Sequence, residues 1–414
     1  MVSDDADVLV IGAGLAGLRC AGVLAAAGRE VRVLELGDDV GGRVRTDAID
    51  GFLCDRGFQV LNSAYPELRR AVDIPALGLK PFGAGVAVRR ERSAAIWAHP
   101  LREPLRVPAM LIGGGIRPTD VLALSRWGIA ALRPGRLTSP ERPDTTLAAA
   151  LDRARVRGEV RRVVDRFLAG VLLEDTGSTS NAFSLLLARM FLRGVPALPA
   201  EGMQALPRQL AAPLDDRIAL NYPVTRIERS ADGWDVWGSD GVTHAPNVVV
   251  AAGPVDAATL TGSAQPATHG VVTDWWASDD IPTTPPMLWV DGRADPAGPV
   301  LNTAVISKAA PSYAPPGRHL IAASALLDSS GAAPPEAVTR QHAGAIMGID
   351  SRNWKPLIRN VIPHALPAQP PPLRARRPVR LGDGLWWCGD HRDTASIQGA
   401  LVSGRRTAEQ ILAT

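Results

Sequence analysis

The stretch DVLVIGAGLAG, residues 7–17, decides the fold of this chain. It opens with a short apolar run rich in β-branched residues, which is typical of a buried parallel strand. The glycines that follow have the spacing GxGxxG and are Gly12, Gly14 and Gly17. Residues 15–27 then predict a helix, and residues 31–35 predict a second strand. Strand, turn, helix and strand within about 30 residues form a βαβ unit.

This glycine turn predicts a binding site for the pyrophosphate of a dinucleotide. In such a turn Gly12 permits the tight bend, Gly14 lets the backbone approach a pyrophosphate, and Gly17 lets the helix pack against the strand. The first residues of the helix, Leu15 and Ala16, offer free N–H groups and the positive end of the helix dipole to the phosphates.

The second predicted strand ends with the acidic residue that a dinucleotide-binding site needs. Glu35 ends the second strand, with Leu36 beside it, and an acidic side chain there accepts hydrogen bonds from ribose hydroxyls. A lone GxGxxG would be weak, because 40 of the 414 residues are glycine. The strand before the motif, the helix after it and Glu35 together make the prediction specific.

Composition excludes several classes of protein. Hydrophobic residues make up 46% and charged residues 21%, as in globular proteins, which excludes a disordered tail, a fibrous repeat and a coiled coil. The net charge is +3 and arginine is spread along the chain, so we expect no nucleic-acid partner.

Three widely spaced cysteines indicate neither a disulfide scaffold nor a metal site. No apolar run reaches the about 20 residues of a membrane span, and we expect a cytoplasmic protein.

Three further motifs extend the predicted site beyond one nucleotide. A second glycine turn with arginines, GGRVR, occupies residues 41–45. The stretch CDRGFQVLNSAYPE follows at 54–67, and near the end of the chain WWCGD at 386–390 precedes SIQGA at 396–400. Together with GxGxxG, these motifs resemble the superfamily of FAD-dependent amine oxidases and phytoene desaturase-like flavoproteins.

The resemblance implies FAD as a noncovalent cofactor. It implies that Asp390 hydrogen-bonds a ribitol hydroxyl, and that the helix starting near Ile397 points its N-terminus at the N1 edge of the flavin. A reduced flavin carries negative charge at that edge, which a helix N-terminus stabilises. The other cofactor-binding residues that the resemblance implies are Gly42, Arg43, Arg45, Gly57, Phe58, Val224, Gly389, Gln398 and Ala400. The alternatives are ordinary surface arginines, a solvated Asp390 and a purely structural Val224.

The resemblance also implies the fold class. We expect an α/β protein in which a Rossmann-like FAD-binding domain of the amine oxidase type is joined to a second, α+β substrate domain. The FAD-binding domain would comprise 1–80, 200–265 and 375–414, and the substrate domain 81–199 and 266–374. Within these pieces the apolar spacing predicts helices over 160–171 and 181–192, and strands near 83–98. The Pro-rich residues 366–378 are expected to be a linker.

Catalytic residues are harder to predict than the cofactor site. Amine oxidases of the superfamily place a lysine near flavin N5, but the corresponding position here lies near His269, where there is no lysine. His269 and Lys308 are therefore the catalytic candidates, with structural roles as the alternative. The missing lysine favours the desaturase-like branch, in which hydride passes from an apolar substrate to flavin N5. A flavin amine oxidase and a non-catalytic FAD-binding partner or sensor remain alternatives.

Two further features of the sequence predict the electron acceptor and a membrane contact. No second GxGxxG offers a nicotinamide site, so oxygen, a quinone or a partner protein is the expected acceptor. Residues 101–136 hold six arginines among apolar residues, which predicts a peripheral contact with an anionic membrane surface. A solvated helical face is the alternative for this segment.

Overall fold

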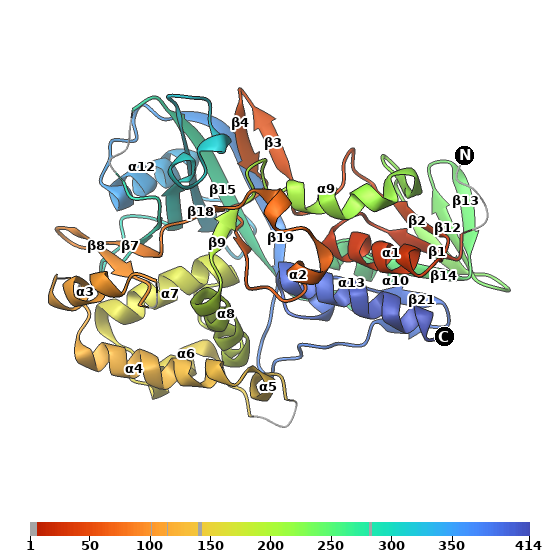
Figure 1. Cartoon of the computed structure of the whole chain (residues 1–414), viewed down its shortest axis with the longest axis horizontal. Coiled ribbons are helices and arrows are strands. Elements are labelled where there is room, and N and C mark those ends of the chain that lie inside the picture. The colour runs from red at the N-terminus through yellow and green to blue at the C-terminus, as the bar shows by residue number, and fades with distance from the viewer. Residues whose placement is uncertain (1–5, 101, 114, 140–142, 281–283) are drawn as a thin grey trace.

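The structure is a computed structural model that describes residues 6–100, 102–113, 115–139, 143–280 and 284–414. The molecule is elongated and holds two large sheets, one toward each end (Figure 1). Its mixture of helices and sheets, with a largely parallel sheet at one end, confirms the predicted α/β fold class.

The first sheet contains the βαβ unit that the glycine motif predicts. β1 (Val8–Ile11), α1 (Leu15–Ala26) and β2 (Val31–Leu34) follow each other, and β1 and β2 pair in parallel. The strand order is β10-β2-β1-β14-β21-β20, with β10 (Ile218–Ala219), β14 (Asn247–Val250), β20 (Arg380–Gly382) and β21 (Leu385–Trp387). All pairings are parallel except that of β20 with β21, which is antiparallel.

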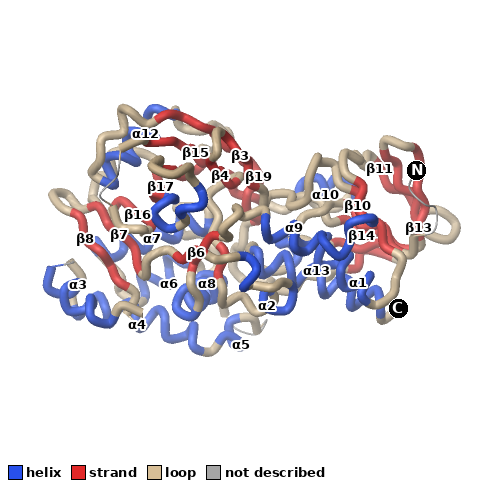
Figure 2. The backbone as a smooth tube through the Cα atoms, turned by 45° about the horizontal axis from the view of Figure 1, so that its top comes forward, coloured by secondary structure: helices blue, strands red, loops and turns tan. Residues whose placement is uncertain are grey.

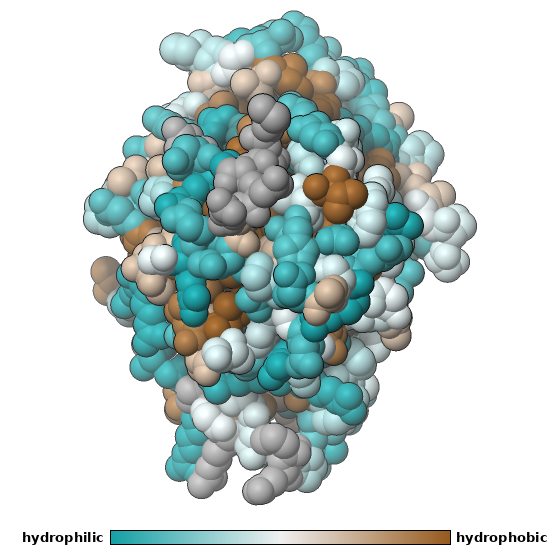
Figure 3. Space-filling model, turned by 90° about the vertical axis from the view of Figure 1, so that its right-hand side faces the viewer, coloured by the Kyte–Doolittle hydropathy of each residue, from teal (hydrophilic) through white to brown (hydrophobic). Residues whose placement is uncertain are grey.

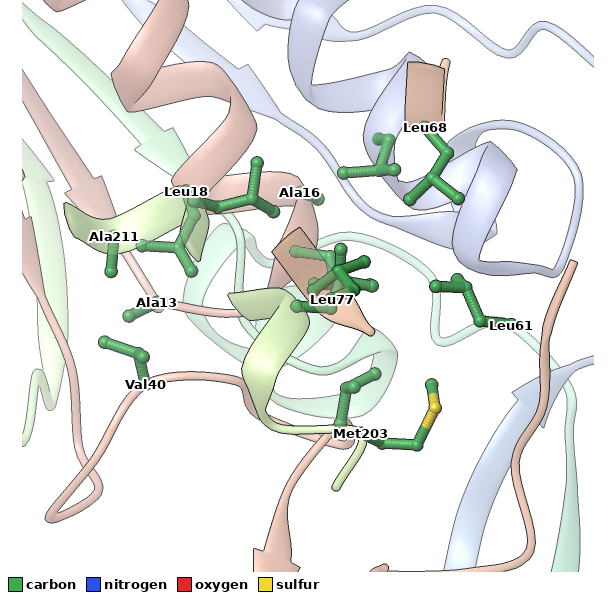
Figure 4. Packing of buried hydrophobic residues seen from close by; sticks show 14 of the residues in the cluster. Ala13, Ala16, Leu18, Val40, Leu61, Leu68, Leu77, Met203 and Ala211 are labelled. Carbon is green, nitrogen blue, oxygen red and sulfur yellow. The ribbon is translucent and has the colours of Figure 1, made fainter. Parts of the chain in front are cut away.

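Layers on both faces bury this sheet. One face packs against α1, α9 (Ala205–Ala211) and α13 (Ile397–Leu412). The other face packs against α10 (Pro254–Thr261) and the antiparallel sheet of β11 (Arg226–Arg229), β12 (Trp234–Gly238) and β13 (Gly241–Ala245). Figure 4 shows that the core around α1 draws side chains from separated segments, including Leu18, Leu68 and Met203.

The second sheet has the order β19-β15-β18-β17-β16-β7-β8. Its strands are β7 (Gly85–Arg89), β8 (Ala94–Ala98), β15 (Thr268–Ser278), β16 (Leu288–Asp291), β17 (Val300–Val305), β18 (His319–Leu326) and β19 (Lys355–Pro367). α12 (Glu336–Met347) covers one face, and α7 (Gly158–Leu172) covers part of the other. The part of this face that α7 does not cover packs against the hydrophobic core of the first sheet. Every strand lies within 81–199 or 266–374, while the domain boundaries themselves stay a prediction.

A group of helices lies beside the second sheet, away from the first (Figures 1 and 2). Its members are η2 (Pro104–Arg106), α3 (Val107–Gly113), α4 (Pro118–Gly128), η3 (Ile129–Leu132), α5 (Pro134–Leu137), α6 (Leu147–Arg153), α7 and α8 (Asn181–Arg193). The helices predicted over 160–171 and 181–192 are present as α7 and α8. Two residues of the segment 101–136, Leu101 and Gly114, lie outside the described residues.

Short elements connect these parts. They are β3 (Thr46–Ile49), β4 (Phe52–Asp55), β5 (Leu61–Asn62), α2 (Leu68–Ala71), η1 (Pro75–Leu77), β6 (Lys80–Pro81), β9 (Pro196–Leu198), η4 (Ala212–Arg217), α11 (Ile306–Ala309), η5 (Pro311–Tyr313) and η6 (Asp390–Arg392). One boundary prediction was wrong: residues 366 and 367, placed in the linker, end β19, because their backbone pairs with the start of β15. No described helix is both long and apolar enough to span a bilayer.

Candidate cofactor and active site

The acidic residue at the end of β2 holds the glycine turn in place. The Glu35 carboxylate accepts hydrogen bonds from the backbone N–H groups of Ala13, at 2.6 Å, and Gly37, at 2.8 Å. The Glu35 carbonyl accepts from Tyr222 N–H, two residues before the half-buried Val224. Leu36 is 71% exposed beside it. The structure therefore brings Glu35, Leu36 and Val224 to one end of the first sheet, next to the glycine turn.

The glycine turn has the form that a bound phosphate needs. Gly12 has a φ of +107°, and a Cβ there would lie 2.9 Å from the Ala251 carbonyl oxygen. A Cβ on Gly17 would lie 2.0 Å from the Gly12 carbonyl oxygen, so both positions demand glycine. In contrast, nothing lies within 4 Å of a Cβ on Gly14, and no side chain caps α1 there. Open space and uncapped N–H groups at Leu15 and Ala16 fit a pyrophosphate.

A continuous path of contacting residues leads from this glycine turn to the C-terminal motif. Gly14 pairs with Gly41, and a Cβ on Gly42 would lie 3.5 Å from the Gly14 Cα. The next residue, Arg43, makes an ion pair with Asp390 at 2.7 Å and donates to the Ala365 carbonyl oxygen at 2.7 Å. Residues 347 positions apart in the chain thus meet at the end of the path.

Asp390 keeps one oxygen available. Its Oδ1 accepts from Arg43, whereas Oδ2 accepts no hydrogen bond from the described residues, and the side chain is 7% exposed. Gly389, which has a φ of +152°, fixes the preceding turn by donating its N–H to Ser403 Oγ. Arg45 lies nearer the glycine turn, where it pairs with Asp38 at 2.8 Å and its Nε has no described partner.

The N-terminus of α13 lies beside the same motif. Ser396 caps the helix by accepting from Gly399 N–H at 3.0 Å, which leaves the N–H groups of Ile397 and Gln398 without intrahelical partners. The Gln398 side chain accepts from Glu67 N–H at 2.9 Å. Ala400 and Ile397 pack against the core around α1.

The loop after β4 joins this region to the second sheet. Gly57 has a φ of +88° and approaches Ile362 of β19, while Phe58 donates its N–H to Thr273 Oγ1 of β15 at 3.2 Å. Thr273 also hydrogen-bonds Ser324 Oγ at 2.9 Å. The predicted residues Gly57 and Phe58 therefore lie on the surface of the second sheet that faces the first.

That sheet face carries a row of uncharged polar side chains. The strand register places Asn360, Thr273, Ser324 and Asn302 side by side across β19, β15, β18 and β17. Thr273 and Ser324 are buried, and Asn360 Oδ1 is buried without a described partner. Because side chains alternate along a strand, the neighbouring Asp274 points to the opposite face, where it accepts from Thr339 of α12 at 2.6 Å.

The two catalytic candidates lie at opposite ends of β15. His269 is opposite Leu366, next to the Ala365 carbonyl that Arg43 contacts. Burial lowers the pKa of His269, although the Glu174 carboxylate opposes this. Burial lowers the pKa of His319, and the nearby charge of Lys308 lowers it further; His319 pairs with Ser278. Ser278 lies nine positions along the strand from His269, about 30 Å away. His269 is thus the candidate near Asp390.

Sequence reasoning missed two buried groups of this region. Asp55 accepts from Thr46 Oγ1 at 2.6 Å, from Met203 N–H at 2.9 Å and from Tyr313 Oη at 3.1 Å, so it joins three segments. Burial raises the pKa of Asp55 to about 6 despite these hydrogen bonds.

His391, the residue after Asp390, is 1% exposed and neither of its ring nitrogens has a described partner. Burial lowers the pKa of His391 to about 3, which keeps the ring neutral. The motif WWCGD ends just before His391. Asp55 lies inside the stretch 54–67, where the resemblance implies roles for Gly57 and Phe58 and none for Asp55.

Comparison with known proteins agrees with this arrangement. The sequence model of flavin-containing amine oxidoreductases matches residues 15–412. The chain belongs to the flavin-containing amine oxidoreductase family. Putrescine oxidase of Kocuria rosea is a relative with 28% identity over 283 residues, which are 58% of this chain and 52% of that protein. The chain thus spans about half the length of the curated relatives it matches.

Solved structures of the family share the fold. A redesigned putrescine oxidase superposes with a TM-score of 0.73 at 18% identity over 99% of both chains. A putative protoporphyrinogen oxidase from Exiguobacterium sp. 255-15 gives the same score at 18% identity, covering 98% of this chain and 99% of the other. The family is described as flavin-containing, so the expected flavin cofactor is confirmed.

Proposed function

We propose that this oxidoreductase removes hydride from a neutral, largely apolar substrate. The observation that carries the proposal is the uncharged row of the sheet face, formed by Asn360, Thr273, Ser324 and Asn302, against which the predicted cofactor residues Gly57 and Phe58 lie. The buried Asp274, which could attract a cationic amine, points to the other face. A desolvated cation would need a carboxylate partner, and this row offers none.

The proposed roles of the cofactor-binding residues follow the path described above. Glu35 accepts from the adenosine ribose, the N-terminus of α1 faces the pyrophosphate, and Asp390 Oδ2 accepts from the ribitol. FAD supplies the hydride acceptor, flavin N5. The free N–H groups at the start of α13 stabilise negative charge on the flavin ring.

His269 is the proposed polar group beside the reacting centre. Its lowered pKa keeps it neutral at physiological pH, so it can accept a proton or orient a substrate hydroxyl. Lys308 is not assigned a role in the reaction, because it lies at the far end of β15 from the Arg43–Asp390 pair.

Amine oxidation is the second candidate function, since the curated relatives include putrescine oxidase. An anaerobic experiment separates the two. The holoenzyme is mixed with retinol, as a neutral apolar probe, or with putrescine, and the visible flavin absorbance is followed. We expect the neutral probe to bleach the flavin and putrescine to leave it oxidised. Bleaching by putrescine alone, with release of an aldehyde, would establish amine oxidation instead.

We further propose that oxygen, a quinone or a partner protein reoxidises the flavin, and that NAD⁺ and NADP⁺ do not. In the described part of the chain, the other glycine junction that follows a strand of the first sheet and starts an α-helix is Gly253, before α10. Pro254 occupies its first helical position and lacks the N–H that a phosphate would use. Chemically reduced enzyme is given each acceptor anaerobically. Saturable reoxidation by NAD⁺ or NADP⁺, with quinone and oxygen inert, would contradict this proposal.

A further inference from the structure

An exposed apolar face runs along η2 and α3. Leu105 is 92% exposed and Ile112 is 89% exposed, and Pro108 and Ala109 between them are exposed too. These four residues have the spacing i, i+3, i+4 and i+7, which places them on one side of a helix. Met110, which points the other way, packs against the core beneath.

A second exposed apolar face runs along α4 and η3. Val121, Leu122, Ile129 and Leu132 are 41%, 52%, 67% and 67% exposed. Their spacing again gives one side of a helix, while Ala123 is buried on the other side. With Leu111 included, η2, α3, α4 and η3 together hold seven of the 15 large hydrophobic residues that the described chain exposes. We call the exposed side chains of residues 102–113 and 115–133, which comprise η2, α3, α4, η3 and the residues next to them, the helical surface.

The charge of the helical surface has one sign. Arg106, Arg117, Arg126 and Arg133 are exposed on it. The acidic residues of the described segment 102–133 are Glu103 and Asp120, and both are half-buried and engaged. Glu103 pairs with Arg106 at 3.3 Å, and Asp120 accepts from Arg117 N–H at 2.9 Å. Exposed aliphatic side chains are therefore mixed with exposed arginines and with no exposed acid.

The position of the helical surface sets it apart from the rest of the molecule. α3 and α4 form the outer edge of the end opposite the first sheet (Figure 1). The end that carries the first sheet shows mostly hydrophilic and intermediate residues, with hydrophobic ones in separate patches (Figure 3).

We propose that the helical surface docks onto the anionic surface of a lipid bilayer. Aliphatic side chains enter the boundary between headgroups and acyl chains, and arginines contact anionic headgroups, which is the arrangement of an interfacial amphipathic helix. A second copy of this chain fits less well, because a two-fold contact would set arginines against arginines. A protein partner is disfavoured because protein interfaces centre on aromatic anchors, and the exposed apolar residues here are aliphatic.

This attachment would hold the enzyme where apolar molecules concentrate, a consequence that rests on the proposed function. The attachment itself depends on the helical surface alone. Flavin content and flavin bleaching are measured on the same samples. An enzyme that bleaches without binding lipid would contradict the attachment and leave the proposed function standing.

The experiment is co-sedimentation of the full-length holoenzyme with vesicles. Phosphatidylcholine vesicles are compared with vesicles that also contain phosphatidylglycerol, at low and at high salt. We expect binding to the anionic vesicles, weakened by salt, and little binding to the neutral ones. The double variant Arg126→Gln/Arg133→Gln should weaken binding roughly thirtyfold, since each arginine near an anionic surface contributes about a fivefold factor. Leu105→Ser/Ile112→Ser should lose binding at both salt concentrations.

Matched variants control for nonspecific effects. Arg29→Gln/Arg153→Gln removes two exposed arginines elsewhere, and Val242→Ser/Leu381→Ser removes two exposed aliphatic side chains elsewhere. Both should bind vesicles as the wild type does. Equal binding by all variants, or no binding to anionic vesicles, would overturn the proposal. A lipid-free dimer that Leu105→Ser/Ile112→Ser dissociates would also overturn it, in favour of a second copy.

Discussion

At the scale of single residues, Glu35 does more than the sequence pattern predicts. The pattern assigns it to a ribose, and the structure shows that its carboxylate also fixes the glycine turn through Ala13 and Gly37. Both backbone groups would lose a charge-assisted hydrogen bond if the carboxylate were removed, and such bonds contribute about 1.5–3 kcal/mol each.

We therefore expect Glu35→Ala to weaken FAD binding roughly tenfold to a hundredfold. The rate of flavin reduction in FAD-saturated enzyme should change little, because this end of the path is far from His269. FAD affinity is measured by titrating the apoprotein. Glu30→Ala, which removes an exposed acid just before β2, is the control and should leave the affinity unchanged. An unaltered affinity in Glu35→Ala would contradict the assignment.

Asp55 gives a prediction about pH. Burial raises its pKa to about 6 in the folded protein, against 3.8 ordinarily. Between these values the native state binds more protons than the unfolded state, so the Asp55 contribution to the free energy of unfolding falls as pH rises. This fall in the free energy of unfolding totals about 3 kcal/mol, and the Asp55 contribution is constant above pH 6.

Urea unfolding at a series of pH values tests this. The difference in unfolding free energy between wild type and Asp55→Asn should change across the interval from pH 4 to 6, because the amide does not titrate. Asp240→Asn, at an exposed site, should give a curve parallel to the wild type. A curve for Asp55→Asn that is also parallel would show that the folded carboxyl titrates normally.

At the scale of elements, the contact between α1 and α13 depends on glycine. A Cβ on Gly404 of α13 would lie 2.1 Å from the Ala16 carbonyl oxygen of α1. Gly22, on α1 itself, has nothing within 4 Å of such a Cβ and an ordinary φ. The same substitution should therefore have opposite effects at the two positions.

We expect Gly404→Ala to lower the free energy of unfolding by about 1–3 kcal/mol, because the helices must move apart. It should also weaken FAD binding, since Ala16 belongs to the N-terminal turn of α1. Gly22→Ala should raise the free energy of unfolding by about 0.5–1 kcal/mol, because alanine has less backbone freedom to lose. Denaturant unfolding measures both, and equal effects of the two substitutions would contradict the packing argument.

At the scale of the whole molecule, the two sheets meet where the predicted FAD segments lie, and all three cysteines are buried. Burial raises the pKa of the Cys54 thiol to about 12. A hydrogen bond with Cys20, together with burial, raises that of Cys388. Neither thiol is available as a nucleophilic thiolate.

The purified protein should therefore be yellow and should hold its flavin without a covalent bond. Acid precipitation should leave the flavin in the supernatant, where its absorbance identifies it. A yellow pellet after acid treatment and washing would contradict noncovalent binding. A protein that stays colourless after reconstitution with FAD would contradict the cofactor site itself.

The sequence by itself determined the βαβ unit, the FAD class and the C-terminal motif. These are local patterns: the glycine spacing, the apolar runs and the capped start of α13 each depend on residues close together in the chain. Only the tertiary structure decided which separated residues meet. It joined Arg43 to Asp390, set His269 and Lys308 at opposite ends of β15, and aligned Asn360 with Thr273. Strand register and long-range packing fix such meetings, and no local spacing in the sequence encodes them.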